Sequence, residues 1–160
     1  MPAKKSTPRS AAAKSKAAEA KSTPARVASL KVIAAPRKED RDPRRAIFID
    51  VENTSGEEAI LASLDQLGFE KVTPSTELVA VGNWRVIGAH VGRMLAQRGA
   101  RLVHTAPATG VKDWSDLSIA VAAGTWLGRA ASGDTIEIIS ADRAFDAVGD
   151  AAAALGVTYR

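Results

Sequence analysis

From residue 46 onward, short apolar segments alternate with longer segments in which apolar residues recur at helical spacing. The apolar segments are expected to form strands at residues 46–50, 77–82, 100–105, 135–140 and 157–159. Helices are expected between them, at residues 55–68, 86–99, 114–127 and 142–155. Strands that alternate with helices in this way are typical of a parallel sheet covered on both faces. The sequence therefore predicts one α/β domain, a three-layer sandwich with a parallel sheet, over residues 46–160.

Acidic residues stand close to the ends of two of these strands and at the start of one helix. Asp50 ends the first apolar segment, Asp142 follows the fourth, and Asp116 lies at the start of the third helix. The carboxyl ends of parallel strands share one edge of the sheet, where ligands bind in such folds. Carboxylates that meet there repel one another unless a cation lies among them. The pattern predicts an oxygen-lined site for Mg²⁺ or Mn²⁺.

Each of these residues also has an ordinary structural explanation. Asp116 and Asp142 could stabilise helix N-termini, and Asn53 could form a turn after the first strand. The helix at 114–127 is apolar around most of its circumference, so we expect it to pack between the sheet and neighbouring helices. Asp50 is harder to explain in this way, because an acid after a buried strand must be solvated, paired or used.

The charge of the chain is divided unevenly. Residues 1–45 carry a net charge of +9 and residues 46–160 a net charge of −5, within an overall charge of +4. The first segment is rich in Ala, Lys, Ser, Pro and Arg, and residues 37–45 form a mixed-charge hinge. We predict a disordered basic N-terminal arm that binds nucleic acid without sequence preference. A tail that only keeps the protein in solution is the alternative.

Composition excludes several classes of protein. The chain has no cysteine and two histidines, so a disulfide framework, a thiolate zinc site and a histidine metal centre are not expected. No segment approaches the roughly 20 apolar residues that span a bilayer. We therefore expect a cytoplasmic protein with no membrane contact.

Four blocks of the sequence resemble one known family. Residues 48–53 (Phe-Ile-Asp-Val-Glu-Asn) resemble the opening motif of the NYN domain, a PIN-like nuclease family. Residues 82–84 (Gly-Asn-Trp) are similar to its glycine, polar residue, tryptophan block. Residues 112–119 resemble its Lys, three residues, Asp, apolar helix block, and residues 140–145 resemble its Ser-x-Asp-x-Asp-Phe block. The resemblance extends over residues 46–160.

The resemblance implies a PIN-like fold and metal-dependent cleavage of RNA. It implies acids at the positions of Asp50, Asp116 and Asp142, as catalytic residues and metal ligands, with Asn53 beside them. Two positions depart from the family pattern, because Ala122 and Ala144 stand where acids are common.

Asp146, two residues after Ala144, is an uncertain substitute for the missing acid and a further candidate metal ligand. On a helix it faces a direction about 200° from that of Ala144. Fewer acids predict weaker metal binding and slower turnover.

Substrate contacts are expected from residues near the same edge. Asn53 is a polar contact, and Lys112 and Arg143 could meet phosphate. Trp84 or Trp114 could stack on an unpaired base, although core packing explains a tryptophan equally well. Single-stranded RNA is the expected partner, and a homo-oligomer is left open.

The expected function is a metal-dependent endoribonuclease, with two alternatives. One keeps the fold as an RNA-binding module with little cleavage, because the acids at positions 122 and 144 are missing. The other is a phosphatase of the haloacid-dehalogenase type, since residues 50–54 approach its Asp-x-Asp-x-Thr signature. A dinucleotide-binding domain is not favoured, because the first strand is not followed by Gly-x-Gly-x-x-Gly.

Overall fold

The computed structural model describes residues 41–54, 56–105 and 113–160. In this part of the chain the elements are β1 (Arg45–Asp50), α1 (Glu57–Gln66), β2 (Thr76–Gly82), α2 (Ala89–Gln97), β3 (Arg101–His104), α3 (Trp114–Leu127), β4 (Thr135–Ile139), the short 3₁₀ helix η1 (Arg143–Phe145), α4 (Asp146–Ala154) and β5 (Thr158–Tyr159). The predicted basic arm falls largely on residues 1–40, which lie outside the described residues.

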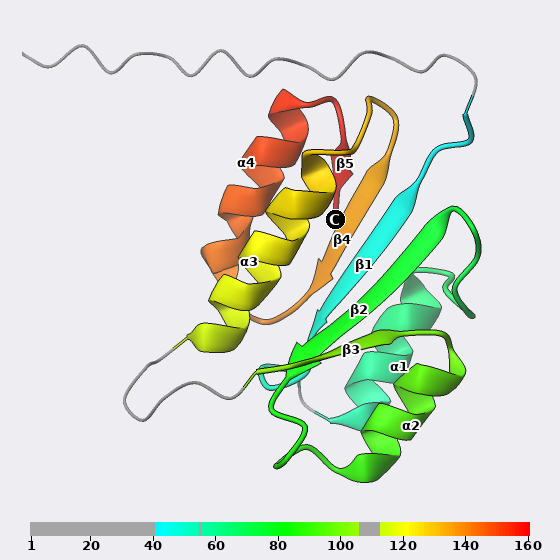
Figure 1. The fold of residues 1–160 in the computed structure, drawn as a ribbon, viewed down its shortest axis with the longest axis vertical. Helices are drawn as coiled ribbons and strands as arrows, with labels where there is room; N and C mark the ends of the chain where they lie inside the picture. Colours follow the sequence, from blue (N-terminus) through cyan, green and yellow to red (C-terminus); the bar gives the residue numbers. More distant parts are fainter. Residues whose placement is uncertain (1–40, 55, 106–112) are drawn as a thin grey trace, which may run out of the picture. The chain divides into compact units, whose positions relative to one another are not determined.

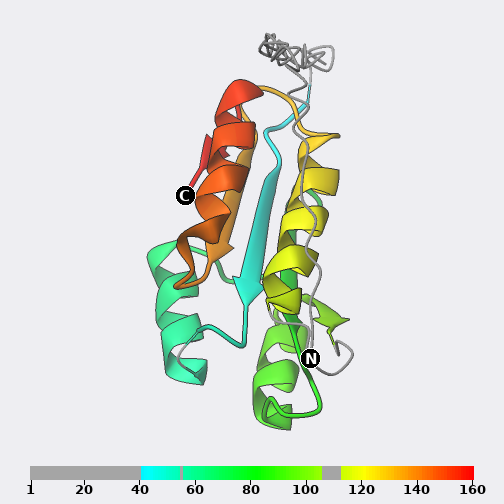
Figure 2. The ribbon, with the colours of Figure 1, turned by 90° about the vertical axis from the view of Figure 1, so that its left-hand side faces the viewer.

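The five strands form one parallel sheet in the order β3-β2-β1-β4-β5. Helices α1 and α2 cover one face of this sheet, and α3 and α4 cover the other (Figures 1 and 2). The predicted α/β fold with a parallel sheet is confirmed. The strand order also reverses direction at β1, since β2 and β3 lie on one side of it and β4 and β5 on the other.

Strand β1 lies in the middle of the sheet and alternates between two apolar cores. Ile47 and Ile49 pack on the side of α1 and α2, whereas Ala46 and Phe48 pack on the side of α3 and α4. All four side chains are almost completely buried. A strand covered on both faces has no polar side, which is why the segment is continuously apolar up to Asp50.

Two helices begin three or more residues later than the sequence indicates. Helix α2 was expected from residue 86 but starts at Ala89, because the backbone N–H groups of Val86 and Ile87 form a turn on the carbonyl of Asn83. The last helix was expected from residue 142 but α4 starts at Asp146, after η1. The Asp142 carboxylate accepts a hydrogen bond from the backbone N–H of Ala144 and holds this tight turn.

Helix α3 has the predicted bounds, and it packs between the sheet and α4 as expected. Its buried side includes Ile119, Trp126 and Leu127. Leu117 and Val121, on another side of the helix, are 57% and 63% exposed. One side of this apolar helix faces away from the core.

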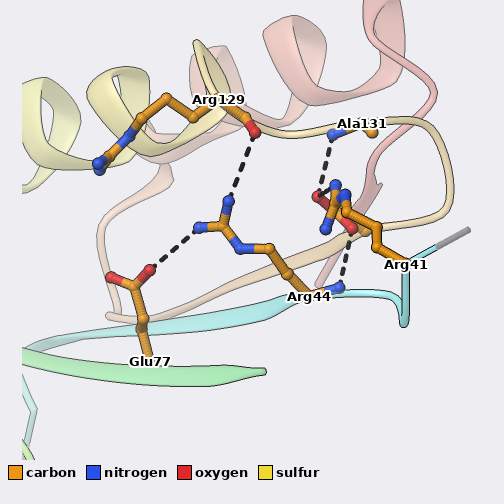
Figure 3. A network of polar contacts seen from close by, with 6 residues as sticks. Arg41, Arg44, Glu77, Arg129 and Ala131 are labelled. Atoms are coloured by element: carbon orange, nitrogen blue, oxygen red, sulfur yellow. Dashed lines mark hydrogen bonds and ion pairs between the residues drawn. The ribbon is translucent and has the colours of Figure 1, made fainter. Parts of the chain in front are cut away.

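At the end of the sheet where the strands begin, arginines from residues 41–45 contact distant acids. Arg41 pairs with Asp134, and Arg44 pairs with Glu77 at 3.1 Å and donates to the carbonyl of Arg129 at 3.4 Å (Figure 3). Arg45 pairs with Glu137 at 2.7 Å. Strand β1 starts at Arg45, and contacts with the domain start at Arg41, so the folded part begins before residue 46.

Among the described residues, no helix is both long enough and apolar enough to cross a bilayer.

Candidate active site

The candidate acids gather near the end of β1, the strand at which the strand order of the sheet reverses. Asp50 is the last residue of β1, and Asp142 follows β4, the strand next to it. Asp116 lies in the first turn of α3, which begins at the end of the sheet toward which β1 and β4 run (Figure 2). In open α/β sheets, ligands bind outside the carboxyl ends of the strands where the strand order reverses. The fold therefore brings these acids to the position that is best suited to a ligand.

Asp50 is fully buried and is held by side chains from two segments. One of its carboxylate oxygens, Oδ2, accepts hydrogen bonds from Asn53 Nδ2 at 2.7 Å and from Ser140 Oγ at 3.0 Å. The hydroxyl of Thr54 donates to the backbone carbonyl of Asp50 at 2.6 Å, which secures the turn after β1. Asp50 thus lies at a fixed place beneath the site.

The amide of Asn53 joins two of the acids. The same nitrogen, Nδ2, that donates to Asp50 also donates to Asp116 Oδ1 at 3.2 Å. An amide group has two N–H donors, so it can satisfy one oxygen on each carboxylate. The side chains of residues 63 positions apart are therefore held against each other by one neutral group.

Asp116 has an unusual proton affinity. Burial raises its pKa, and a hydrogen bond with Asp50 and the negative charges of Asp50, Asp142 and Asp113 raise it further, from 3.8 to about 6. Each of these causes disfavours the ionised carboxylate. None of the ion pairs among the described residues involves Asp50, Asp116 or Asp142. The cluster carries like charges that the rest of the described chain does not neutralise.

Asp142 lies at the open side of the site. Its side chain is exposed, and its backbone N–H donates to Ser140 Oγ at 3.1 Å. The Ser140 hydroxyl therefore touches both Asp50 and the Asp142 backbone. Asp142 and Asp116 line one pocket of about 300 Å³, together with Asp113, Leu117, Ala120, Ala144 and Phe145.

Three of the predicted site residues do not join this cluster. Asp146 and Arg143 pair with each other at 3.2 Å. Burial raises the pKa of Tyr159 and the charge of Asp146 raises it further, so Asp146 also lies near Tyr159. Trp84 packs against the core beside α2 and donates its indole N–H to the carbonyl of Val103 at 2.9 Å, which indicates a structural role. Lys112 lies outside the described residues.

Two residues of the site were not singled out from the sequence. Ser140 and Asp113 both lie inside the recognised blocks, but a serine after a strand and an acid before a helix are common in any α/β protein. Asp113 adopts a left-handed backbone conformation with φ of 56°, rare for a residue other than glycine. This conformation starts α3 and brings a further negative charge close to Asp116.

The donor chemistry of the site fits a hard cation held partly through water. Within the ranges that the structure describes, no three His, Cys, Asp or Glu side chains form a ready-made metal cage. Asp50 is already engaged by Asn53 and Ser140, whereas Asp116 and Asp142 line the pocket together with Asp113. Mg²⁺ commonly binds to one or two carboxylates and completes its shell with water and substrate phosphate. The residues fit such a site, whereas a cage of four carboxylates that includes Asp146 does not agree with the geometry.

No protein-family model matches the chain, and no curated protein matches it in sequence.

Proposed function

We propose that the protein is a metal-dependent endoribonuclease that cleaves single-stranded RNA at the Asp50–Asp116–Asp142 cluster. The proposal rests chiefly on one observation, the Asn53 bridge between two buried carboxylates at the turning point of the sheet. Buried acids that are held together without a neutralising cation cost stability, and such arrangements concentrate at functional sites. The resemblance of residues 48–53, 112–119 and 140–145 to the NYN domain supports the same reaction.

The mechanism assigns a distinct task to each side chain. A bound Mg²⁺ or Mn²⁺ supplies Lewis-acid stabilisation of the charge on the phosphodiester oxygens. Asp116 and Asp142 would hold the cation from the pocket, and Asp50 fixes Asn53 and Ser140 in place. Asp116 would also orient the attacking water and accept its proton. The water oxygen attacks phosphorus in line with the leaving ribose oxygen, that P–O bond breaks, and the leaving oxygen takes a proton from solvent.

The first test is cleavage of a 5′-labelled, unstructured RNA with Mg²⁺, with Mn²⁺ and with EDTA. We expect cleavage with either metal and none with EDTA, and we expect Asp50→Asn to abolish it. An Asp50→Asn variant that cleaves as well as the wild type would refute the proposal. A deoxyribose strand of the same sequence and a small chromogenic phosphate ester serve as substrate controls, and hydrolysis of the ester alone would favour a phosphatase.

A second candidate function keeps the fold and loses most of the chemistry. It is favoured by the lack of a ready-made three-carboxylate group among the described residues. Ala122 packs against the core, whereas Ala144 is exposed and lines the same pocket as Asp116 and Asp142. A carboxylate at position 144 would therefore face the proposed cation.

The Ala144→Asp variant separates the two candidates. If the protein is an RNA-binding module with a degenerate site, this substitution should create cleavage that the wild type lacks. If the wild type is already a nuclease, both proteins should cleave RNA, and the substitution should mainly change the affinity for the metal. Ala122→Asp is the matched control, because its carboxylate would be placed against the apolar core instead.

A further inference from the structure

A second cavity adjoins the acid cluster on the other face of the sheet. It has a volume of about 620 Å³, in the range of small-molecule sites. Its walls come from α1 and the segment after it, from β4, and from the residues that follow β1 and β4. The lining residues include Ala59, Ser63, Gln66, Glu137, Ile139 and Arg160. We call this cavity the α1–β4 groove.

The groove and the acid cluster share two residues. Asn53 and Ser140 line the groove, and both also donate hydrogen bonds to the Asp50 carboxylate. A molecule in the groove would therefore lie one side chain away from Asp50. The groove therefore meets the acid cluster through the side chains of Asn53 and Ser140.

Glu137 gives the groove an acceptor that the fold leaves only partly used. Its side chain is 1% exposed, and Oε2 is held by Arg45 at 2.7 Å. The other oxygen, Oε1, is buried and has no hydrogen-bond partner among the described residues. The guanidinium of Arg160 lies 3.6 Å from it, beyond good hydrogen-bond distance, on a side chain that is 64% exposed. Burying an acceptor without a donor is unfavourable, so a donor supplied by a ligand would be stabilised there.

We infer that the α1–β4 groove binds the nucleobase and ribose of the nucleotide next to the cleaved phosphate, an inference that rests on the proposed function. Apolar walls such as Ile139 and Leu67 suit the faces of a base. An N–H group on the base edge donates to Glu137 Oε1 once Arg160 swings toward solvent, where it meets the backbone phosphate. A groove with one carboxylate and one guanidinium suits an uncharged base better than a row of phosphates. Bases of single-stranded RNA are commonly read in this way, by contacts to their edges and faces.

Uncharged nucleosides test the groove because they carry no phosphate, so they neither attract the basic arm nor undergo cleavage. Adenosine, guanosine, cytidine and uridine are titrated in turn into the full-length ¹⁵N-labelled protein in EDTA. At least one should shift the amide signals of Ser63, Gln66 and Ser140 in a saturable way. Ala59→Phe fills the groove and should weaken this binding about 10-fold or more, and Ala62→Phe is the matched control on an exposed part of the same helix.

A further variant tests the acceptor itself. Glu137→Gln keeps the size of the side chain but can place an N–H group where Oε1 was, so the order of preference among the four nucleosides should change. Unfolding curves confirm that each variant is folded. The inference is overturned if no nucleoside shifts these amides, or if Ala59→Phe binds nucleosides as the wild type does. Dilution-dependent shifts of the same amides without nucleoside would also overturn it, because a second copy of the chain would then occupy the groove.

The groove and the nuclease proposal fail in different ways. If no nucleoside binds, and the wild type and Ala59→Phe cleave RNA equally well, the groove inference is refuted and the nuclease proposal stands. If the wild type binds a nucleoside, Ala59→Phe abolishes this binding, and the wild type cleaves no RNA with Mg²⁺ or Mn²⁺, the nuclease proposal is refuted and the groove inference stands.

Discussion

Asp134, where the strands of the sheet begin, and Asp116, near where they finish, are both buried but have different partners. Asp134 is 1% exposed and accepts hydrogen bonds from Arg41 and from the backbone N–H groups of Arg44 and Ala131. Asp116 is 9% exposed, accepts one from Asn53, and has Asp50, Asp142 and Asp113 as charged neighbours. One acid lies among donors, and the other lies among acids.

The pKa values of the two aspartates move in opposite directions for this reason. Burial acts to raise the pKa of Asp134, but the hydrogen bonds from Arg41, Arg44 and Ala131 and the charge of Arg41 outweigh it, and the pKa is lowered. Burial and like charges both raise the pKa of Asp116, to about 6. The same residue type therefore stabilises the fold at one end of the sheet and costs stability at the other. Such a cost at the edge of the sheet where ligands bind in this type of fold is what a binding or catalytic site predicts.

The largest effect on stability is expected at Asp134, at the end of the sheet where the acid is paired with donors. Asp134→Ala should lower the free energy of unfolding by about 3–5 kcal/mol, because it leaves buried donors without an acceptor. Chemical denaturation at neutral pH measures this. The folded pKa of Asp134 is lowered, so its contribution is present above the ordinary pKa of 3.8 and is lost as the pH falls through the folded value. The difference between variant and wild type should therefore shrink in acid.

Glu77→Ala is the control for that measurement. Glu77 pairs with Arg44 at 3.1 Å, but its side chain is 46% exposed. Exposed pairs contribute about 0–1 kcal/mol, because water already solvates both charges. An equally large loss in Glu77→Ala would show that burial is not what distinguishes Asp134.

At the end of the sheet where Asp116 lies among other acids, replacing the aspartate should raise the free energy of unfolding instead of lowering it. Asp116→Asn should stabilise the metal-free protein at about pH 8, by no more than about 3 kcal/mol, the value of a pKa shift from 3.8 to about 6. The folded state binds this proton more tightly than the unfolded state, so the cost appears as the pH rises from about 4 to about 6 and is complete above that. Denaturation curves of wild type and variant across this range should therefore converge in acid and separate above pH 6.

Divalent metal should reduce the difference in stability between the wild type and Asp116→Asn. A cation that binds the folded state stabilises it by mass action. Excess Mg²⁺ or Mn²⁺ should raise the melting temperature of the wild type more than that of Asp116→Asn. If neither metal shifts the wild type, the acids do not form a cation site.

A smaller effect is expected when the neutral bridge is removed. Asn53→Ala takes away the N–H groups that hold Asp50 Oδ2 and Asp116 Oδ1. Outer groups that orient metal ligands typically change metal affinity or activity by about 10–100-fold, so RNA cleavage should fall by that factor. Asn53→Asp is the informative partner variant, since it keeps the size of the side chain but adds a further negative charge to the cluster. Unchanged cleavage in both would show that the bridge has only a structural role.

The fold could be predicted because its signal is local and repeated. Most strands are apolar segments and most helices amphipathic ones, although α3 is apolar around most of its circumference, and the acid at residue 50 marks the end of β1 by itself. The convergence of Asp50, Asp116 and Asp142 followed from one rule, that parallel strands end at the same edge. These three positions needed no knowledge of side-chain packing.

The pairs between distant residues could not be predicted in this way. Arg41 and Asp134 are 93 positions apart, and their contact depends on the register between β1 and β4. Residues 41–45 therefore look like a polar hinge in the sequence, although in the fold they hold one end of the sheet. The α1–β4 groove is hidden for the same reason, because it depends on how far α1 covers β4.

At Asp146 a short turn replaces the start of the predicted helix, although the expectation that this acid points away from position 144 agrees with its place outside the cluster. A helix from residue 142 would have turned Asp146 about 200° away from Ala144, and η1 gives the segment a different path. Asp146 instead lies beside Arg143, as one of two exposed partners. The Asp142 cap that forms η1 depends on a single side-chain hydrogen bond, which no periodic pattern reveals.

The smallest effect is expected at this residue, and it tests whether position or charge alone defines the site. Asp146→Asn removes a negative charge four residues after Asp142, from a side chain that is 65% exposed. Its pair with Arg143 is at the surface, where such pairs contribute little, so stability and RNA cleavage should both stay close to the wild-type values. Asp142→Asn should reduce cleavage and metal binding under the same conditions, because Asp142 lines the pocket and raises the pKa of Asp116. Equal losses of cleavage in the two variants would mean that the reaction depends on the total charge of this loop, and the contrast between the two ends of the sheet would then no longer identify the site.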